Sequence, residues 1–214
     1  MDHENDLENW FKSQQEILAI DVKEIALADG QDWVITQEDG RPHHIGHKTG
    51  KYHRGVLLKA WDNVRQAWIE RFLLAPIPPE GVEKFYGVTL IARYNDRYLV
   101  QAKAEPGNPT PGHVQLTSTI QASYTNIMAQ LSGSIPFTWM YKNERCIQLI
   151  SSQDGAQLYL KNNKVSFLEL AEEPKEIPEN FAWATAAEIK SFAQRGLVSE
   201  HIMQCLGVCF LADK

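Results

Sequence analysis

Near the start of the chain, mostly apolar residues recur every three or four positions, which is the spacing of one helix face. These positions are Leu7, Trp10, Phe11, Gln14 and Leu18. Asn5 or Asp6, just before Leu7, is a candidate cap for this helix. The pattern predicts an N-terminal amphipathic helix whose aromatic face needs a partner, either the core of the protein or a second subunit.

From Val22 onward the pattern changes to short runs rich in β-branched and aromatic residues, which are typical of strands. The predicted strands are 22–27, 33–36, 56–61, 69–74, 88–94, 98–104, 114–122, 147–151, 158–160 and 165–170. Asn95, Asp96 and Arg97 separate two of these runs and predict a hairpin.

Helical spacing returns near the end of the chain. Thr185 stands three positions before Glu188, which is the spacing of a capping box, and Ile189 and Phe192 follow at helical intervals. A second short helix is predicted over 199–206. The order of a helix, many strands and late helices favours the α+β class, with one core of good size as the expected arrangement.

Composition and charge exclude several function classes. The formal charge of −6 over 214 residues argues against a nucleic-acid or anionic-membrane surface, which needs a concentrated positive field. The three cysteines are too few for a disulfide framework, and Cys205 and Cys209 lie in an apolar tail that indicates packing. No apolar run suits a signal peptide or a membrane span, so we expect a cytoplasmic protein.

Polar residues gather where one predicted strand ends. Gln101, Lys103 and Glu105 alternate along the strand and therefore share a face. A turn, Pro106-Gly107-Asn108, follows, and the next strand carries the amides of Gln115 and Gln121. A solvated charged face would produce the same alternation, but an amine, a carboxylate and two amides at one strand end favour a polar pocket.

The same stretch resembles a known family. Residues 101–108, Gln-Ala-Lys-Ala-Glu-Pro-Gly-Asn, and residues 114–122, Val-Gln-Leu-Thr-Ser-Thr-Ile-Gln-Ala, are similar to motifs of the NDP-hexose 2,3-dehydratases. Further similar segments, at 47–52, 152–155 and 181–189, follow in the family's order. The resemblance implies a Nudix-like mixed β-sheet flanked by helices. It departs from the family in four ways. Known members carry two such modules in tandem, Tyr124 replaces a usual arginine, Ser118 replaces a usual proline, and the family's terminal Met-Asp-x-Arg is not visible in residues 199–202.

The resemblance also implies an activity. Residues 1–214 would form a single module of a hydro-lyase that removes water from an NDP-4-keto-6-deoxyhexose without a cofactor or a metal ion. Lys103 and Glu105 would be the catalytic pair, in an order that the sequence leaves open. The substrate-binding residues would be Gln101, Asn108, Gln115, Thr119, Gln121, Asn126, His53 and Trp61. Two copies would pair as a homodimer that reproduces the tandem arrangement.

Other functions remain open at this point. The chain could be a non-catalytic nucleotide-sugar binding or partner subunit, or it could apply the same pocket to a non-sugar substrate. A diphosphate hydrolase is disfavoured, because no Arg-Glu-x-x-Glu-Glu pattern supplies carboxylates for Mg²⁺. His43, His44, His47 and His53 cluster in a predicted loop, but their spacing matches no common zinc site.

Overall fold

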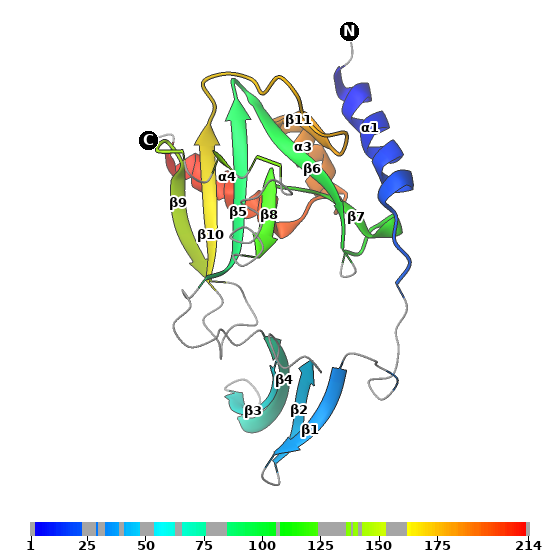
Figure 1. Cartoon of the computed structure of the whole chain (residues 1–214), viewed down its shortest axis with the longest axis vertical. Coiled ribbons are helices and arrows are strands. Elements are labelled where there is room, and N and C mark those ends of the chain that lie inside the picture. The colour runs from blue at the N-terminus through cyan, green and yellow to red at the C-terminus, as the bar shows by residue number, and fades with distance from the viewer. Residues whose placement is uncertain are drawn as a thin grey trace. The chain divides into compact units, whose positions relative to one another are not determined.

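The structure is a computed structural model, and it describes a defined part of the chain. The described residues are 3–22, 29, 33–38, 41–47, 54–62, 66–75, 85–105, 108–123, 136–137, 139–140, 143–152 and 162–212. The chain divides into two compact units. Unit 1 comprises Met1–Val22, Phe85–Ser151 and Asn162–Lys214, and unit 2 comprises Lys23–Lys84 and Ser152–Lys161. Figure 1 draws both units, which are described separately below.

The described part of unit 2 is a four-stranded antiparallel sheet. Its strands are β1 (Trp33–Glu38), β2 (Arg41–His47), β3 (Arg54–Asp62) and β4 (Ala67–Ala75), in the order β1-β2-β3-β4. The prediction of a loop for the histidine-rich segment is wrong at His43, His44 and His47, because these residues belong to β2. Backbone pairing with β1, which places Thr36 opposite His44, overrides the weak strand propensity of this polar segment.

Unit 1 is built on a seven-stranded sheet among the described residues. Its strands are β5 (Phe85–Tyr94), β6 (Arg97–Ala104), β7 (Val114–Thr117), β8 (Ile120–Ser123), β9 (Ile147–Ser152), β10 (Asn162–Glu169) and β11 (Phe181–Thr185). The main path runs β11-β6-β5-β10-β9, with β7 added to β6 and β8 added to β5. Strand β10 is parallel to β5, whereas the β6 pairings and the β5–β8 pairing are antiparallel.

The sheet forks between β5 and β6. These strands pair only near their hairpin, at Ala92–Tyr94 and Arg97–Leu99, and beyond that point β6 pairs with β7 and β5 pairs with β8. The single predicted strand 114–122 is therefore wrong, because the chain breaks at Ser118 and Thr119 to cross the fork. The Thr119 hydroxyl accepts from Ala92 N and donates to Leu99 O, so it braces both branches.

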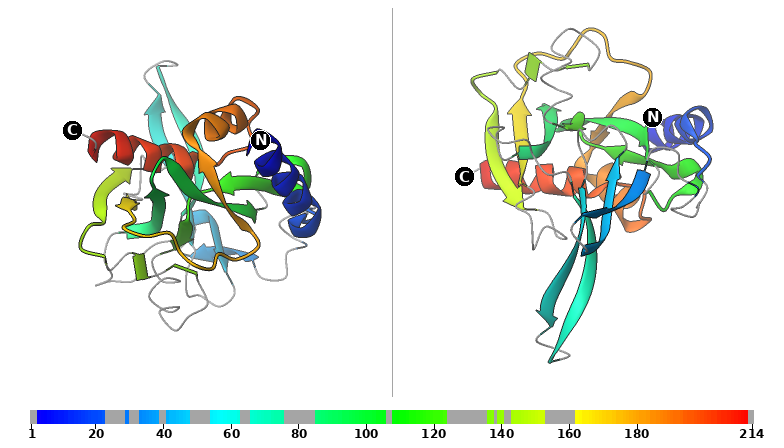
Figure 2. Two further views of the ribbon diagram at one scale, coloured as in Figure 1. Left: turned by 90° about the horizontal axis from the view of Figure 1, so that it is seen from above. Right: turned by 60° about the horizontal axis from the view of Figure 1, so that its bottom comes forward.

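Among the described residues, three α-helices accompany this sheet: α1 (His3–Leu18), α3 (Ala186–Gln194) and α4 (Glu200–Ala212). Figure 2 shows α1 and α3 near the β6 side of the sheet and α4 running across it, in agreement with the packing of α4 on β10, β5 and β7. Helices α1 and α3 share a core in which Phe11 meets Phe192 edge to face, with ring centroids 5.1 Å apart. The expected aromatic face of α1 is thus covered by the core of unit 1.

Several sequence predictions are confirmed. The fold is a mixed α+β arrangement with helices flanking the sheet and an amphipathic helix at the N-terminus. Asn95 and Asp96 form the predicted hairpin turn, with Asn95 at a φ of 57°. The capping box at Thr185 and Glu188 is present. Cys205 and Cys209 are packed in the core on the buried face of α4.

Two helix boundaries differ from the prediction. Helix α1 begins at His3, so Asn5 and Asp6 lie inside it and do not cap it. Acidic groups in the first turn of a helix favour its positive end, which explains how the helix extends through these polar residues. Helix α4 continues to Ala212 because its last turns remain apolar and bury Val208 and Cys209. No helix among the described residues is long and apolar enough to cross a membrane.

Candidate functional site

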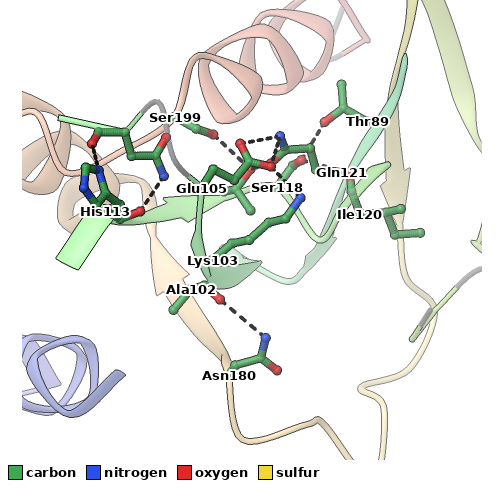
Figure 3. Close-up of polar contacts among 12 residues, drawn as sticks. Thr89, Ala102, Lys103, Glu105, His113, Ser118, Ile120, Gln121, Asn180 and Ser199 are labelled. Atoms are coloured by element: carbon green, nitrogen blue, oxygen red, sulfur yellow. Dashed lines mark hydrogen bonds and ion pairs between the residues drawn. The ribbon is translucent and has the colours of Figure 1, made fainter. Parts of the chain in front are cut away.

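The predicted polar cluster at the end of β6 is present. The Lys103 Nζ atom lies 2.7 Å from Glu105 Oε1, and the two side chains are 33% and 39% exposed. They lie on the β6 face of Leu99, whereas Val100 and Ala102 pack into the core formed with α1 and α3. The strand alternation therefore brings an ammonium and a carboxylate together at an accessible strand end. Figure 3 shows both side chains directed toward Gln121.

Strand β8 completes the cluster across the fork. Gln121 Nε2 donates to both carboxylate oxygens of Glu105, at 3.2 Å and 3.3 Å. Gln121 Oε1 accepts from the Thr117 hydroxyl at 2.6 Å, and Thr117 Oγ1 lies 2.9 Å from Ser199 Oγ. Five side chains from β6, β7, β8 and the segment before α4 thus form one continuous network. A ligand at this site would meet a charged pair whose positions are fixed from both branches of the sheet.

The network holds Glu105 in its ionised form. Burial opposes ionisation, but the hydrogen bond and charge of Lys103, the Gln121 amide and the charge of His201 outweigh it. Together these groups keep the pKa of Glu105 below its ordinary value. At neutral pH the pair therefore presents a carboxylate that can accept a proton, beside an ammonium that can donate hydrogen bonds.

Asn108 lies in the loop that follows Glu105, where it closes the turn. Its side-chain Nδ2 donates to the backbone oxygen of His113 at 2.9 Å, and the backbone oxygen of Asn108 lies 2.7 Å from His113 Nδ1. The backbone N–H of Glu105 also donates to His113 O, at 3.1 Å. This latch fixes the backbone of Glu105, and the Asn108 amide nitrogen predicted to bind substrate contacts the protein itself.

The other predicted binding residues on the sheet have different surroundings. Gln101 shares the face of Lys103 and lies opposite Thr117 in the β6–β7 register. Gln115 lies opposite Lys103 in the same register, but its Nε2 donates to Gly196 O at 2.9 Å. Thr119 is buried, and its hydroxyl bridges backbone groups of β5 and β6. Gln121 alone among these has a hydrogen bond to the charged pair in the described part of the chain.

Three predicted binding residues do not belong to the described part of unit 1. Asn126 and His53 lie outside the described residues. Trp61 belongs to β3 of unit 2, where it lies opposite Trp68 in the register with β4. Within the described residues, no three His, Cys, Asp or Glu side chains come together in a way that could hold a metal ion.

The sequence analysis missed three residues of this site. Thr117 could have been found by alternation, because it shares the β7 face of Gln115. Ser199 and His201 approach the cluster only through the fold, since the backbone N–H of Ser199 donates to Leu116 O at 2.8 Å. This pairing brings the start of α4 beside β7, and no local pattern in the sequence encodes it.

A separate groove of about 590 Å³ lies elsewhere in unit 1. It is lined by residues of α1, the β5–β6 hairpin, β11 and the start of α3, among them Trp10, Arg97, Trp183 and Glu188. None of the predicted catalytic or binding residues lines this groove. Size therefore does not select the candidate site, which is defined by its converging polar groups.

Known proteins resemble this chain along most of its length. A sequence profile described as NDP-hexose 2,3-dehydratase matches residues 4–202. A dTDP-4-dehydro-6-deoxy-α-D-glucopyranose 2,3-dehydratase of Amycolatopsis orientalis is 23% identical over 94% of this chain and 44% of that protein. A protein of the same name from Streptomyces violaceoruber is 28% identical over 68% of this chain and 32% of that protein.

A third similar protein bears the same name in Saccharopolyspora spinosa, and it is 30% identical over 42% of this chain and 19% of its own length. Among solved structures, an ADP compounds hydrolase superposes with a TM-score of 0.45 and 8% identity, over 73% of this chain and 84% of that chain. The chain spans less than half the length of the curated relatives it matches. Because the profile covers nearly the whole sequence, the chain belongs to the NDP-hexose 2,3-dehydratase family.

Proposed function

We propose that this chain acts as a dehydratase on a nucleoside-diphosphate 4-keto-6-deoxyhexose, as a single module over residues 1–214. The dTDP-linked sugar in the names of its relatives is the first candidate substrate. The observation that carries the proposal is the contact of 2.7 Å between Lys103 and Glu105 at an accessible strand end, in a chain of this family. The pair also differs from a simple surface ion pair, because Gln121 of β8 donates to both oxygens of Glu105.

The substrate carries its own electron sink. Its C4 ketone makes the C3 hydrogen acidic, because the electron pair left at C3 delocalises into an enolate. A base then takes the C3 proton, the bond from C2 to its hydroxyl oxygen breaks, and the oxygen leaves as water once it receives a proton. The protein has to supply a base, a donor for the enolate oxygen and a route for that proton.

We assign these tasks to the charged pair. Glu105 takes the C3 proton and returns it to the departing C2 hydroxyl, so one carboxyl group serves both steps. Its lowered pKa keeps it ionised before the substrate binds. Lys103 has three N–H donors, of which one is needed for Glu105, so the others can stabilise the enolate oxygen. This assignment orders the two residues, which the sequence alone left open.

Substrate binding is proposed for the remaining residues of the site. Gln101 and Gln121 would contact the sugar, since they share the surroundings of the charged pair. Gln115 and Asn108 would use the amide oxygens that their hydrogen bonds to the backbone leave uncommitted. Thr119, Asn126, His53 and Trp61 stay substrate-binding predictions from the sequence.

The alternative function is that of a non-catalytic partner subunit, which would bind a nucleotide sugar through the same N–H donors of Lys103 and Gln121 without moving a proton. For the catalytic function we propose that two copies associate as a homodimer. We also propose that the protein is cytoplasmic, because three cysteines are too few for a disulfide framework.

The test is exchange of the C3 hydrogen of dTDP-4-keto-6-deoxyglucose with deuterium from solvent, followed by NMR. We expect the wild-type chain to catalyse exchange and Glu105→Gln to lower its rate by ~100-fold or more. Glu173→Gln is the matched control, because it neutralises a glutamate in the segment after β10 that pairs with Arg97 at 3.2 Å. Saturable binding of the sugar without exchange would replace catalysis by the binding function.

A further inference from the structure

The hydrogen bonds behind Glu105 run in a single direction. Thr117 can donate only one hydrogen, and it lies 2.6 Å from Gln121 Oε1, which only accepts. The Ser199 hydroxyl, 2.9 Å away, must therefore donate to Thr117. The Gln121 amide nitrogen donates in turn to the carboxylate. The donated hydrogens of this series, from Ser199 to Thr117 to Gln121 to Glu105, therefore all point toward the negative charge. We call the series the donor chain.

The direction follows from chemistry rather than from the drawn orientation of one amide. An ionised carboxylate has no hydrogen, so the Gln121 group that faces Glu105 must be the NH₂. The opposite amide orientation would set Gln121 Oε1 against the carboxylate and turn the NH₂ toward Thr117. The carboxylate selects the first orientation, and Thr117 then donates its single hydrogen to Gln121 Oε1, which holds the amide in that orientation. Thr117 is only 2% exposed, so water does not readily replace it.

We propose that Thr117 and Ser199 are positioning residues, which orient the Gln121 amide so that it holds Glu105 in place for proton transfer. The inference rests on the proposed function for its catalytic consequence only. Ser199 precedes α4 and its backbone N–H donates to Leu116 O. The packing of α4 against β7 thus determines where the donor chain begins, and aligned donors of this kind reinforce one another.

Other charged groups also face Glu105, and they define what the donor chain adds. Lys103 approaches from β6 and His201 from α4, and both favour the ionised carboxylate. Neither of them is in hydrogen-bond contact with Thr117 in the described part of the chain. Removal of the Thr117 hydroxyl therefore leaves these charges in place and removes the hydrogen bonds to Gln121 and Ser199.

The test compares Thr117→Val with Thr117→Ser. The pKa of Glu105 is read by carboxyl ¹³C NMR titration, and the Gln121 side-chain amide by ¹⁵N NMR. We expect Thr117→Val to raise the pKa of Glu105 and to shift the amide signals, and Thr117→Ser to restore both. In the exchange assay kcat should fall ~10-fold with little change in KM, because a misplaced carboxylate slows proton transfer. Ser199→Ala should shift the same signals by less.

Thr110→Val is the matched control. It also removes a buried threonine hydroxyl, but that hydroxyl donates to Val114 O and has no bond to Gln121. A folded Thr117→Val protein with wild-type Glu105 and Gln121 signals would overturn the proposal. If Thr117→Val does not fold, the Ser199→Ala titration decides in its place. A wild-type chain without exchange activity would refute the dehydratase function, while the NMR titrations would still decide the orienting role.

Discussion

Gln121 and Glu105 are sixteen residues apart in the sequence, yet one amide group reaches both oxygens of the carboxylate, at 3.2 Å and 3.3 Å. The contact spans the fork of the sheet, since Gln121 belongs to β8 and Glu105 follows β6. The two branches have no direct strand pairing at this point. Ionised Glu105 therefore links the branches, and its charge contributes to stability.

The first prediction concerns pH. The folded pKa of Glu105 lies below its ordinary value of 4.5, so the ionised carboxylate stabilises the fold. This contribution is fully present above pH 4.5 and is lost as the pH falls below it through the folded pKa. Urea unfolding of wild type and Glu105→Gln should show a stability difference at pH 7 that shrinks toward pH 3. Because the pair is more than one-third exposed on the Glu105 side, the difference should be below ~1 kcal/mol and smaller in high salt.

A difference that stays constant between pH 3 and pH 7 would contradict this interpretation. Glu173→Gln again supplies the comparison, because its pairing with Arg97 is exposed and lacks an amide from a second branch. We expect its unfolding free energy to differ from wild type by a few tenths of a kcal/mol at most.

A second ion pair fastens α1 to the end of α3. Arg195 Nη1 and Nη2 donate to the two Glu8 oxygens at 3.1 Å and 2.7 Å, and the guanidinium lies 4.6 Å above the Phe192 ring. The pairing lowers the pKa of Glu8 and raises that of Arg195. Arg195→Lys keeps the charge but loses the two-pronged geometry. We expect faster amide hydrogen exchange in α1, with β10 unchanged, and exchange equal to wild type in α1 would refute the role.

Much of unit 1 could be predicted because its signals are local. The helix face of Leu7 and Phe11, the capping box at Thr185 and the turn at Asn95 each follow from a few neighbouring residues. The alternation that placed Lys103 and Glu105 on one face is equally local, and the structure confirms it.

The parts that failed depend on distant partners. Strand β2 carries a polar histidine-rich sequence and exists because β1 pairs with it. The break at Ser118 and Thr119 has no Gly, Pro, Asn or Asp to indicate it, since its reason is the fork between β5 and β6. Ser199 reaches the site only because its segment pairs with Leu116. Local patterns define faces and caps, whereas pairings across the fold decide which faces meet.

The third prediction tests the core that covers α1. Phe11 is 1% exposed and packs edge to face on Phe192. Phe11→Ala removes a large buried ring and leaves a cavity, so it should lower the free energy of unfolding by about 3–5 kcal/mol. Phe210→Ala is the control, because Phe210 is 73% exposed and its loss should cost less than ~0.5 kcal/mol. Equal effects of the two variants in urea unfolding would show that α1 does not depend on this contact.

The last prediction concerns the Cys205 thiol, which lies on the buried face of α4. Cys205 is fully buried beside Thr89, whose hydroxyl also contacts Ser118 Oγ. Burial raises the pKa of the Cys205 thiol to about 12 despite the hydrogen bonds that favour the thiolate. Alkylation requires the thiolate, so Cys205 should resist iodoacetamide at pH 8 in the folded protein and react once urea unfolds it. Peptide mass spectrometry of both samples gives the measurement. Rapid alkylation of Cys205 in the folded protein would mean that α4 separates readily from β5 and β10. A helix that opens so easily could not keep Ser199 in hydrogen-bond contact with Thr117.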